Sequence, residues 1–289
     1  EHLRMFAQPW ATIETIPAER NTGLLDLDAL RLRLGPDVAA VLVENPSYLG
    51  FLEERAAGIA ELAHGAGALS VVRVDPVTLG VLAAPADYGA DIVAGDVQPL
   101  GNHQLFGGGQ CGFIAHRDDS DYVRENPAIL ISAVPTRDGT ATGFAWSLLS
   151  STSYDLRGDS RDFTGTSQWL WGIGTAVHLS LLGPAGIVEL GEGLVARAAY
   201  AIERLSRVPG LAVPLVGRSH VTEFVVGFDG AGSTVAEVNR GLRERGIFGG
   251  HDLSARFPEF GQAALYRFTE RHGQAEIDRL ADAIAEVLR

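Results

Sequence analysis

The sequence predicts an α/β protein whose first half forms a largely parallel sheet and whose second half forms a separate α+β domain. In the first half, short apolar strands alternate with amphipathic helices at the spacing of right-handed βαβ units. In the second half, long helices interleave with only a few strands. We place the boundary near Leu149, so residues 1–149 and 150–289 form the two domains, and the polar stretch 150–165 links them.

The expected elements of the first half follow from hydrophobic periodicity. Asp26 is a candidate N-cap for the first helix, and Gly65 ends the second. The parallel strands bring their carboxyl ends to one edge of the sheet, which is where such proteins bind ligands. We expect strands at Thr12–Ile16, Val38–Val43, Leu69–Val74, Ile92–Ala94 and Cys111–Ala115, with helices at Asp26–Leu34 and Leu52–Gly65.

The second half is expected to be richer in helix. Gly183 and Pro184 separate its first two helices, because proline cannot continue a helix. The closing helix is amphipathic. We expect helices at Gln168–Leu182, Pro184–Leu205, Val235–Arg245 and Gln274–Leu288, with strands at Phe224–Phe228 and Leu265–Thr269.

Composition limits the function classes. The chain has 289 residues, 46% of them hydrophobic, and a formal charge of −13. An acidic chain is a poor candidate for binding nucleic acid or an anionic membrane. We find no signal-like start and no apolar run of the ~18 residues that a membrane span needs. Because the chain begins with Glu1 rather than Met, we expect a segment to be missing upstream.

Cysteine and lysine usage are both informative. Cys111 is the single cysteine, which excludes an internal disulfide and favours a reducing, cytoplasmic location. It is either a catalytic thiol or an inert cysteine beside glycine. All 23 Lys and Arg positions are arginine. Base composition of a GC-rich genome explains such a bias, yet the consequence holds: the chain has no lysine amine for a Schiff base, and arginine does not replace it.

Candidate ligand-binding residues lie at the predicted edge of the sheet. Asp75 ends a buried strand, so its carboxylate either caps a turn or holds a ligand cation such as a pyridinium. The triple glycine Gly107–Gly109 either lets backbone amides approach a phosphate or forms a tight turn. His103 lies in the same loop, where an isolated histidine without metal-ligand spacing is usually a surface residue.

Other motifs are weaker or absent. Arg157 belongs to a mixed-charge cluster with Asp159, Arg161 and Asp162. It either forms local salt bridges or binds a substrate carboxylate. There is no GxxxxGK[ST] phosphate loop, no GxGxxG opening a helix and no GxSxG elbow. These absences disfavour a P-loop, a Rossmann cofactor site and a serine hydrolase.

An ordered set of short stretches resembles the P-protein of the glycine cleavage system, glycine dehydrogenase (decarboxylating), and above all subunit 1 of its two-subunit form. The resemblance covers nearly the whole chain, and the order of the stretches makes it specific. The stretches are ENPSYLG (44–50), IAELAH (59–64), VDP (74–76), GADIVAG (89–95), QPLGN (98–102), FGG (106–108), LLGP (181–184), EFVV (223–226), PE (258–259), TER (269–271) and EIDRL (276–280).

The resemblance implies the fold type I (aspartate aminotransferase-like) architecture of pyridoxal-phosphate enzymes, with an incomplete large α/β domain and a C-terminal α+β small domain. It implies that Asp75 holds the pyridine nitrogen or is a vestige or cap. It also implies that the catalytic subunit carries its lysine where this chain has Asn102 and His103. The implied cofactor-binding residues are Asp75, Asn102, His103, Gly107 and Gly108, with Arg157 as a candidate for the substrate.

Two departures from the family qualify what the resemblance implies. The family's front third, including a phosphate loop, has no counterpart, so this is an N-terminally shortened member. We expect a half-built sheet with an apolar edge that a partner chain covers. The stretch from Tyr154 to Gly165 is rewritten, which points away from glycine and the lipoyl carrier protein and toward another amino acid as substrate.

The leading hypothesis is therefore a non-catalytic subunit that pairs with a lysine-bearing, pyridoxal-phosphate-holding subunit, for example as α2β2, in an amino-acid decarboxylase. A separate chain would supply the missing front third. One alternative is a non-enzymatic interaction protein with a decayed enzyme fold. Another is an enzyme that binds the cofactor noncovalently and uses His103 as its catalytic base. No nucleic acid, membrane or metal is expected to bind.

Overall fold

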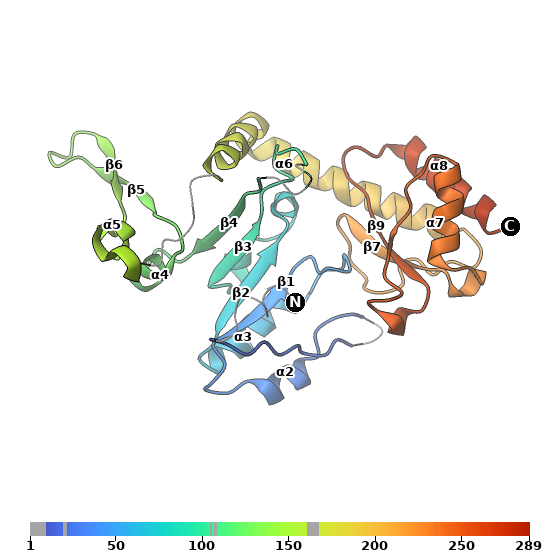
Figure 1. Ribbon diagram of the computed structural model, residues 1–289, viewed down its shortest axis with the longest axis horizontal. Coiled ribbons are helices and arrows are strands. Elements are labelled where there is room, and N and C mark those ends of the chain that lie inside the picture. Colours follow the sequence, from blue (N-terminus) through green and yellow to red (C-terminus); the bar gives the residue numbers. More distant parts are fainter. Residues whose placement is uncertain (1–9, 20–21, 105, 107–108, 161–167) are drawn as a thin grey trace.

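Two sheets joined by one long helix organise the chain in this computed structural model (Figure 1). The structure describes residues 10–19, 22–104, 106, 109–160 and 168–289. A four-stranded sheet belongs to the first half of the chain, and a three-stranded sheet belongs to the second half. Helix α6 (Trp169–Ser206) runs between them, and a two-stranded hairpin projects on the side away from the three-stranded sheet.

The four-stranded sheet has the order β1-β2-β3-β4. Its first three strands are parallel and the last is antiparallel, so the largely parallel sheet expected from the sequence is confirmed. Within the described residues, β1 and β4 each have one neighbour and leave open edges, where Leu42 and Ile114 are exposed. The strands are β1 (Ala40–Glu44), β2 (Leu69–Val74), β3 (Ile92–Asp96) and β4 (Gly112–His116).

Two helices of the first half pack beside β1 and β2. They are α2 (Leu27–Arg33) and α3 (Ala56–Gly65). The predicted N-cap is confirmed, because Asp26 accepts hydrogen bonds from the backbone N–H groups of Asp28 and Ala29, both at 3.0 Å. The predicted strand at residues 12–16 is wrong: this segment pairs with no strand, and Ile16 instead packs against the apolar cluster beneath α2 and α3.

A short turn after β2 makes a very close backbone contact with the second half of the chain. It is a 3-10 helix, η1 (Pro76–Gly80), capped by Asp75. A Cβ atom at Gly80 would lie 2.2 Å from the carbonyl oxygen of Ile187 in α6, so only glycine allows this approach. A second 3-10 helix, η2 (Pro85–Tyr88), leads into β3.

The hairpin and its neighbouring helices were not expected from the sequence. The strands β5 (Ile131–Pro135) and β6 (Thr142–Trp146) are antiparallel, and Gly139 with φ 70° lies in the turn between them. Large apolar side chains such as Phe144 remain exposed on this hairpin. Around it lie α4 (Ser120–Glu125), η3 (Leu149–Ser151), α5 (Ser153–Leu156) and η4 (Arg157–Asp159). The boundary placed near Leu149 stays a prediction.

Helix α6 is broken at the predicted position. Gly183 has φ 64° and ψ 177°, and Pro184 follows it, so two helical segments meet at a kink. Among the described residues, α6 is the one helix that is long and apolar enough to cross a membrane by length and composition, a feature that the sequence analysis missed. The segment before the kink spans only about 21 Å at 1.5 Å per residue, against the ~30 Å of a bilayer core.

The three-stranded sheet carries helices on one face and the candidate site on the other. Its order is β7-β9-β8, all antiparallel. Thr234 and Glu237 form a capping box at the start of α7. Phe224, Phe228 and Ile284 are fully buried between this sheet, α7, α8 and the end of α6. The elements are β7 (Glu223–Gly227), η5 (Asp229–Ala231), α7 (Val235–Glu244), β8 (His251–Asp252), η6 (Pro258–Phe260), β9 (Ala263–Arg267) and α8 (Gln274–Val287).

A buried carboxylate ties the elements around β3 together. Asp91 is 4% exposed and accepts a hydrogen bond from the Ser70 N–H at 2.8 Å. Its oxygens also lie 2.7 Å from His64 Nε2 and 2.7 Å from an Arg117 nitrogen. Burial alone would raise the pKa of Asp91, but the Ser70, His64 and Arg117 interactions outweigh it and hold that pKa below its ordinary value.

Replacing Asp91 by Asn should lower the free energy of unfolding by about 2 kcal/mol at neutral pH, because the buried Ser70 N–H, His64 and Arg117 lose a charged acceptor. A depressed pKa gives stability that is present above the ordinary carboxyl range and is lost as pH falls through the folded-state value. Urea unfolding at several pH values measures both effects. Asp28→Asn is the control, since its ion pair with Arg31 is exposed. An Asp91→Asn chain as stable as that control would contradict the prediction.

Candidate active-site cavity

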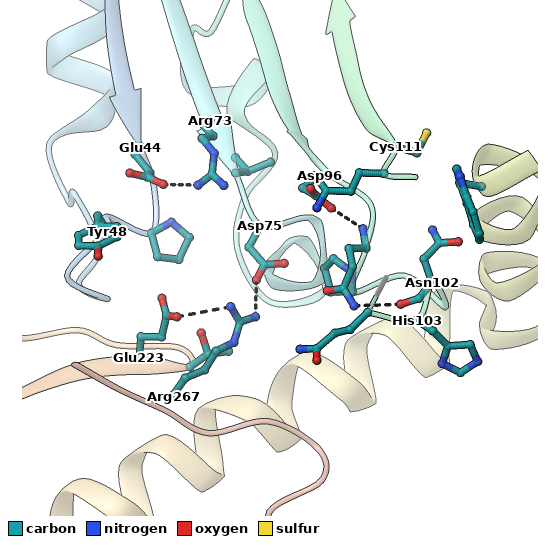
Figure 2. A pocket seen from close by; sticks show the side chains of 18 of the residues that line it. Glu44, Tyr48, Arg73, Asp75, Asp96, Asn102, His103, Cys111, Glu223 and Arg267 are labelled. Carbon is teal, nitrogen blue, oxygen red and sulfur yellow. Dashed lines mark hydrogen bonds and ion pairs between the residues drawn. The ribbon is translucent and has the colours of Figure 1, made fainter. Parts of the chain in front are cut away.

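A cavity of about 560 Å³ lies between the carboxyl ends of β1, β2 and β3 and the face of the three-stranded sheet (Figure 2). The sequence placed a ligand site at this edge of the first sheet. It did not reveal that the second sheet closes the other side. The lining includes Glu44, Tyr48, Arg73, Asp75, Asp96, Asn102, His103, Cys111, Trp171, Glu223 and Arg267.

Asp75 has a partner for each carboxylate oxygen. Oδ1 accepts a hydrogen bond from the Val77 N–H at 3.2 Å and so caps η1. Oδ2 lies 3.1 Å from Nη2 of Arg267, which comes from β9 of the other sheet. The turn-capping interpretation of Asp75 therefore describes one oxygen, and an arginine of this chain stands beside the other.

Further charges surround this pair. Arg267 also lies 3.4 Å from Glu223, its cross-strand neighbour on β7. Burial raises the pKa of Glu223, the negative charges of Asp75 and Glu44 raise it further, and Arg267 opposes them. Arg73 pairs with Glu44, its neighbour across β1 and β2. The described lining thus has more carboxylates than guanidinium groups, which disfavours an anionic ligand.

Asn102 fixes the loop that the sequence singled out. Its Nδ2 donates hydrogen bonds to the Val97 carbonyl at 3.1 Å and to Thr175 Oγ1 of α6 at 2.8 Å. Gln98 donates back to the Asn102 carbonyl at 3.0 Å. Asp96 receives the Gln98 N–H at 2.6 Å. Asn102 therefore acts as a tether between the loop and the long helix.

The other residues proposed from the sequence have different locations. His103 lines the cavity and is exposed. Gly107 and Gly108 lie outside the described residues. Arg157 lies in η4 with φ 52°, is exposed, and does not line the cavity. Within the described part of the chain, no cluster of three His, Cys, Asp or Glu side chains could hold a metal ion.

The sequence analysis missed Arg73, Glu44, Glu223 and Arg267. Arg73 and Glu44 are polar residues in otherwise apolar strands, which was an available signal. Arg267 and Glu223 lie in the second half of the chain, 192 residues from Asp75 in the case of Arg267. Their approach to Asp75 depends on the packing of the two halves.

Cys111 lies at the cavity wall and has the properties of an unreactive thiol. Burial raises the pKa of its thiol, and the negative charge of Asp96 raises it further. The thiolate is the nucleophilic form, so both causes lower reactivity at neutral pH. The inert interpretation of this cysteine therefore fits the geometry better than the catalytic one.

The chain matches the family profile described as glycine cleavage system P-protein over residues 5–238. The chain belongs to the glycine cleavage system P-protein family. It is 35% identical, over 96% of its own length, to a probable glycine dehydrogenase (decarboxylating) subunit 1 of Staphylothermus marinus. It is 32% identical, over 99% of its length, to the corresponding protein of Desulfitobacterium hafniense. It spans 58% and 62% of these two relatives.

Solved structures agree with this membership. A glycine decarboxylase (P-protein) of the glycine cleavage system, in inhibitor-bound form, superimposes with a TM-score of 0.85 at 34% identity, covering 99% of this chain and 62% of that one. A sphingosine-1-phosphate lyase of Burkholderia pseudomallei gives 0.68 at 16% identity, covering 98% and 60%. These neighbours confirm the fold type I architecture of pyridoxal-phosphate enzymes.

The described residues of this P-protein family member do not complete a pyridoxal-phosphate site. The chain has no lysine to bond the cofactor. The Asp75 oxygen available to a pyridine nitrogen is paired with Arg267. The cofactor phosphate would face a wall with excess carboxylates. The described lining of the cavity therefore does not fit the cofactor on its own.

The raised pKa of Cys111 predicts slow alkylation of this single thiol by iodoacetamide at pH 7. The rate should rise as pH increases toward the raised value, and Asp96→Asn should react several-fold faster because one cause is removed. Mass spectrometry of timed samples measures the rate. The chain unfolded in guanidinium is the reference, and Asp119→Asn, which removes a carboxylate charge at a helix cap elsewhere, is the control. A folded chain that reacts as fast as the unfolded one would be incompatible with the inert thiol.

Proposed function

We propose that this chain is the non-catalytic, lysine-lacking subunit of a heteromeric pyridoxal-phosphate-dependent amino-acid decarboxylase that resembles the glycine cleavage P-protein. A partner subunit carries the lysine and holds most of the cofactor, which supplies an electron sink for α-carbon chemistry. This chain contributes the lining of its acidic cavity to the wall of the assembled site. The rewritten stretch between Tyr154 and Gly165 favours an amino acid other than glycine as substrate.

One observation carries the proposal: a chain with the P-protein architecture contains no lysine at all. In a pyridoxal-phosphate enzyme the lysine amine is the covalent anchor of the cofactor, and neither arginine nor histidine substitutes for it in that bond. The matched relatives are named subunit 1 of glycine dehydrogenase (decarboxylating), which is a name for one part of a larger enzyme. Both facts support a role beside a catalytic chain.

The surface of α6 supports a protein partner. In its first half, Trp169 is 59% exposed and Leu181 is 83% exposed. Leu170, Ile173 and Val177 are also exposed, so an apolar face of this helix is left largely uncovered in the described structure. Apolar patches of this extent mark interfaces. Because the segment before the kink is too short for a bilayer core, we assign the face to a partner chain.

The open edges of the first sheet support a further chain or segment beside this one. Strands β1 and β4 each leave backbone hydrogen-bonding groups without a sheet neighbour among the described residues. Such edges in globular proteins are usually paired or covered. The two relatives are longer than the region that this chain matches.

Purification of the tagged chain from its native host should bring down a stoichiometric second subunit together with the visible absorbance of lysine-bound pyridoxal phosphate. We expect the absorbance to come from the second subunit, because this chain has no lysine and the partner is proposed to carry it. Mass spectrometry after borohydride reduction would locate the modified lysine. A colourless chain recovered alone would overturn the proposal and favour a non-enzymatic interaction protein with a decayed fold.

Charges placed on the exposed face of α6 should weaken the heteromer. Ile173→Asp combined with Leu181→Asp should reduce the recovered partner at least about tenfold, because buried interface positions tolerate unpaired charge poorly. The control is Leu32→Asp, an 86% exposed leucine on α2 outside this face. Pull-down with quantified band ratios is the measurement. Equal recovery with both proteins would show that the face is not the interface.

A further inference from the structure

Three charged side chains from the two halves of the chain meet at one point of the cavity (Figure 2). Asp75 reaches it from the end of β2. Arg267 and Glu223 reach it from paired positions on β9 and β7. Arg267 lies between the two carboxylates, 3.1 Å from Asp75 and 3.4 Å from Glu223. The Asp75 side chain is 24% exposed and that of Arg267 is 46% exposed, so the group is partly shielded from water.

Each carboxylate oxygen of Asp75 already has a partner from this chain. Oδ1 is used by the turn that follows β2, since it accepts the Val77 N–H. Oδ2 faces Arg267. A ligand that needs a carboxylate partner for a ring N–H group would have to displace the guanidinium. A planar arginine with several donors is a strong competitor for that position.

Arg267 also offsets the negative charge of one carboxylate from each sheet. Burial and the neighbouring carboxylates raise the pKa of Glu223, and Arg267 is the group that lowers it. Without Arg267, Asp75 and Glu223 would face each other with no cation between them. The pair Arg73 and Glu44 lies in the same cavity, yet both belong to the first sheet. Arg267 is therefore the cavity arginine whose ion pair joins the two sheets.

We propose that Arg267 is a built-in occupant of the ligand-facing oxygen of Asp75: it joins the two sheets across the cavity and keeps a pyridine-type cation out of this chain. The first part rests on the geometry alone. The consequence that another subunit holds the cofactor rests on the proposed function. Arg267 is in this view a positioning residue, and its guanidinium stands where a ligand ring nitrogen would otherwise bind.

The test is binding of pyridoxamine to the full chain, measured by calorimetry at neutral pH. Pyridoxamine carries the pyridine ring and a cationic amine without a phosphate, so the acidic wall does not repel it. We expect no saturable binding to the unchanged chain. Arg267→Ala should bind at least about tenfold tighter, because one charge-assisted hydrogen bond becomes available. Asp75→Asn combined with Arg267→Ala should lose this gain.

Arg73→Ala is the matched control, because it removes the same charge from the same cavity and leaves Asp75 paired. The proposal is overturned if the unchanged chain binds pyridoxamine saturably, if Arg73→Ala gains as much as Arg267→Ala, or if the gain persists without Asp75. Should Arg267→Ala fail to fold, Arg267→Gln removes the charge with a smaller loss of packing and is held to the same three outcomes.

Thermal unfolding provides a second measurement. An arginine that only filled space would show no coupling to Asp75 in the Tm values. If the two side chains act as a pair, Asp75→Asn and Arg267→Gln together should lower Tm by less than the sum of their separate effects. Additive effects would contradict the pairing. This test and the test of the proposed function can fail separately. If the chain co-purifies with a coloured partner but Arg267→Ala gains no pyridoxamine binding, only the present inference is overturned.

Discussion

The close packing of the turn after β2 against α6 determines the geometry of the cavity. Gly80 and the backbone of Ile187 approach so closely that a methyl group would not fit between them. The turn begins at Asp75, and α6 leads into the three-stranded sheet. This contact, together with the equally close approach of Gly50 to the backbone of Glu223, sets how far the carboxyl ends of the first sheet lie from the second. Core packing resists such small displacements, so the spacing is well defined.

That spacing explains the charge pattern of the cavity. Two sheets that approach each other with carboxylates on both sides need a cation between them, since buried like charges repel. Arg267 supplies it, and Glu223 is its neighbour across the strands. An ion pair of the chain's own residues therefore bridges the two sides of the cavity.

The remaining surfaces fit a chain that works within an assembly. The first sheet has open edges in the described residues, the first half of α6 is apolar and exposed, and the hairpin β5–β6 carries exposed aromatic side chains. Each feature costs solubility in an isolated protein. Together with the identity to relatives named as subunits, these features support the proposed partner chain.

The sequence by itself determined the features that depend on local pattern. These include strand β2, the Asp26 cap, the break of α6 at Gly183 and the absence of lysine, because periodicity, capping and composition are local properties. It erred at residues 12–16, where Ile16 packs against an apolar cluster and no strand forms, and it overlooked a hairpin with a Gly139 turn. Tertiary structure alone brought Arg267 to Asp75 across 192 residues. That meeting depends on the β7–β9 register and on the packing of α6, which no local pattern encodes.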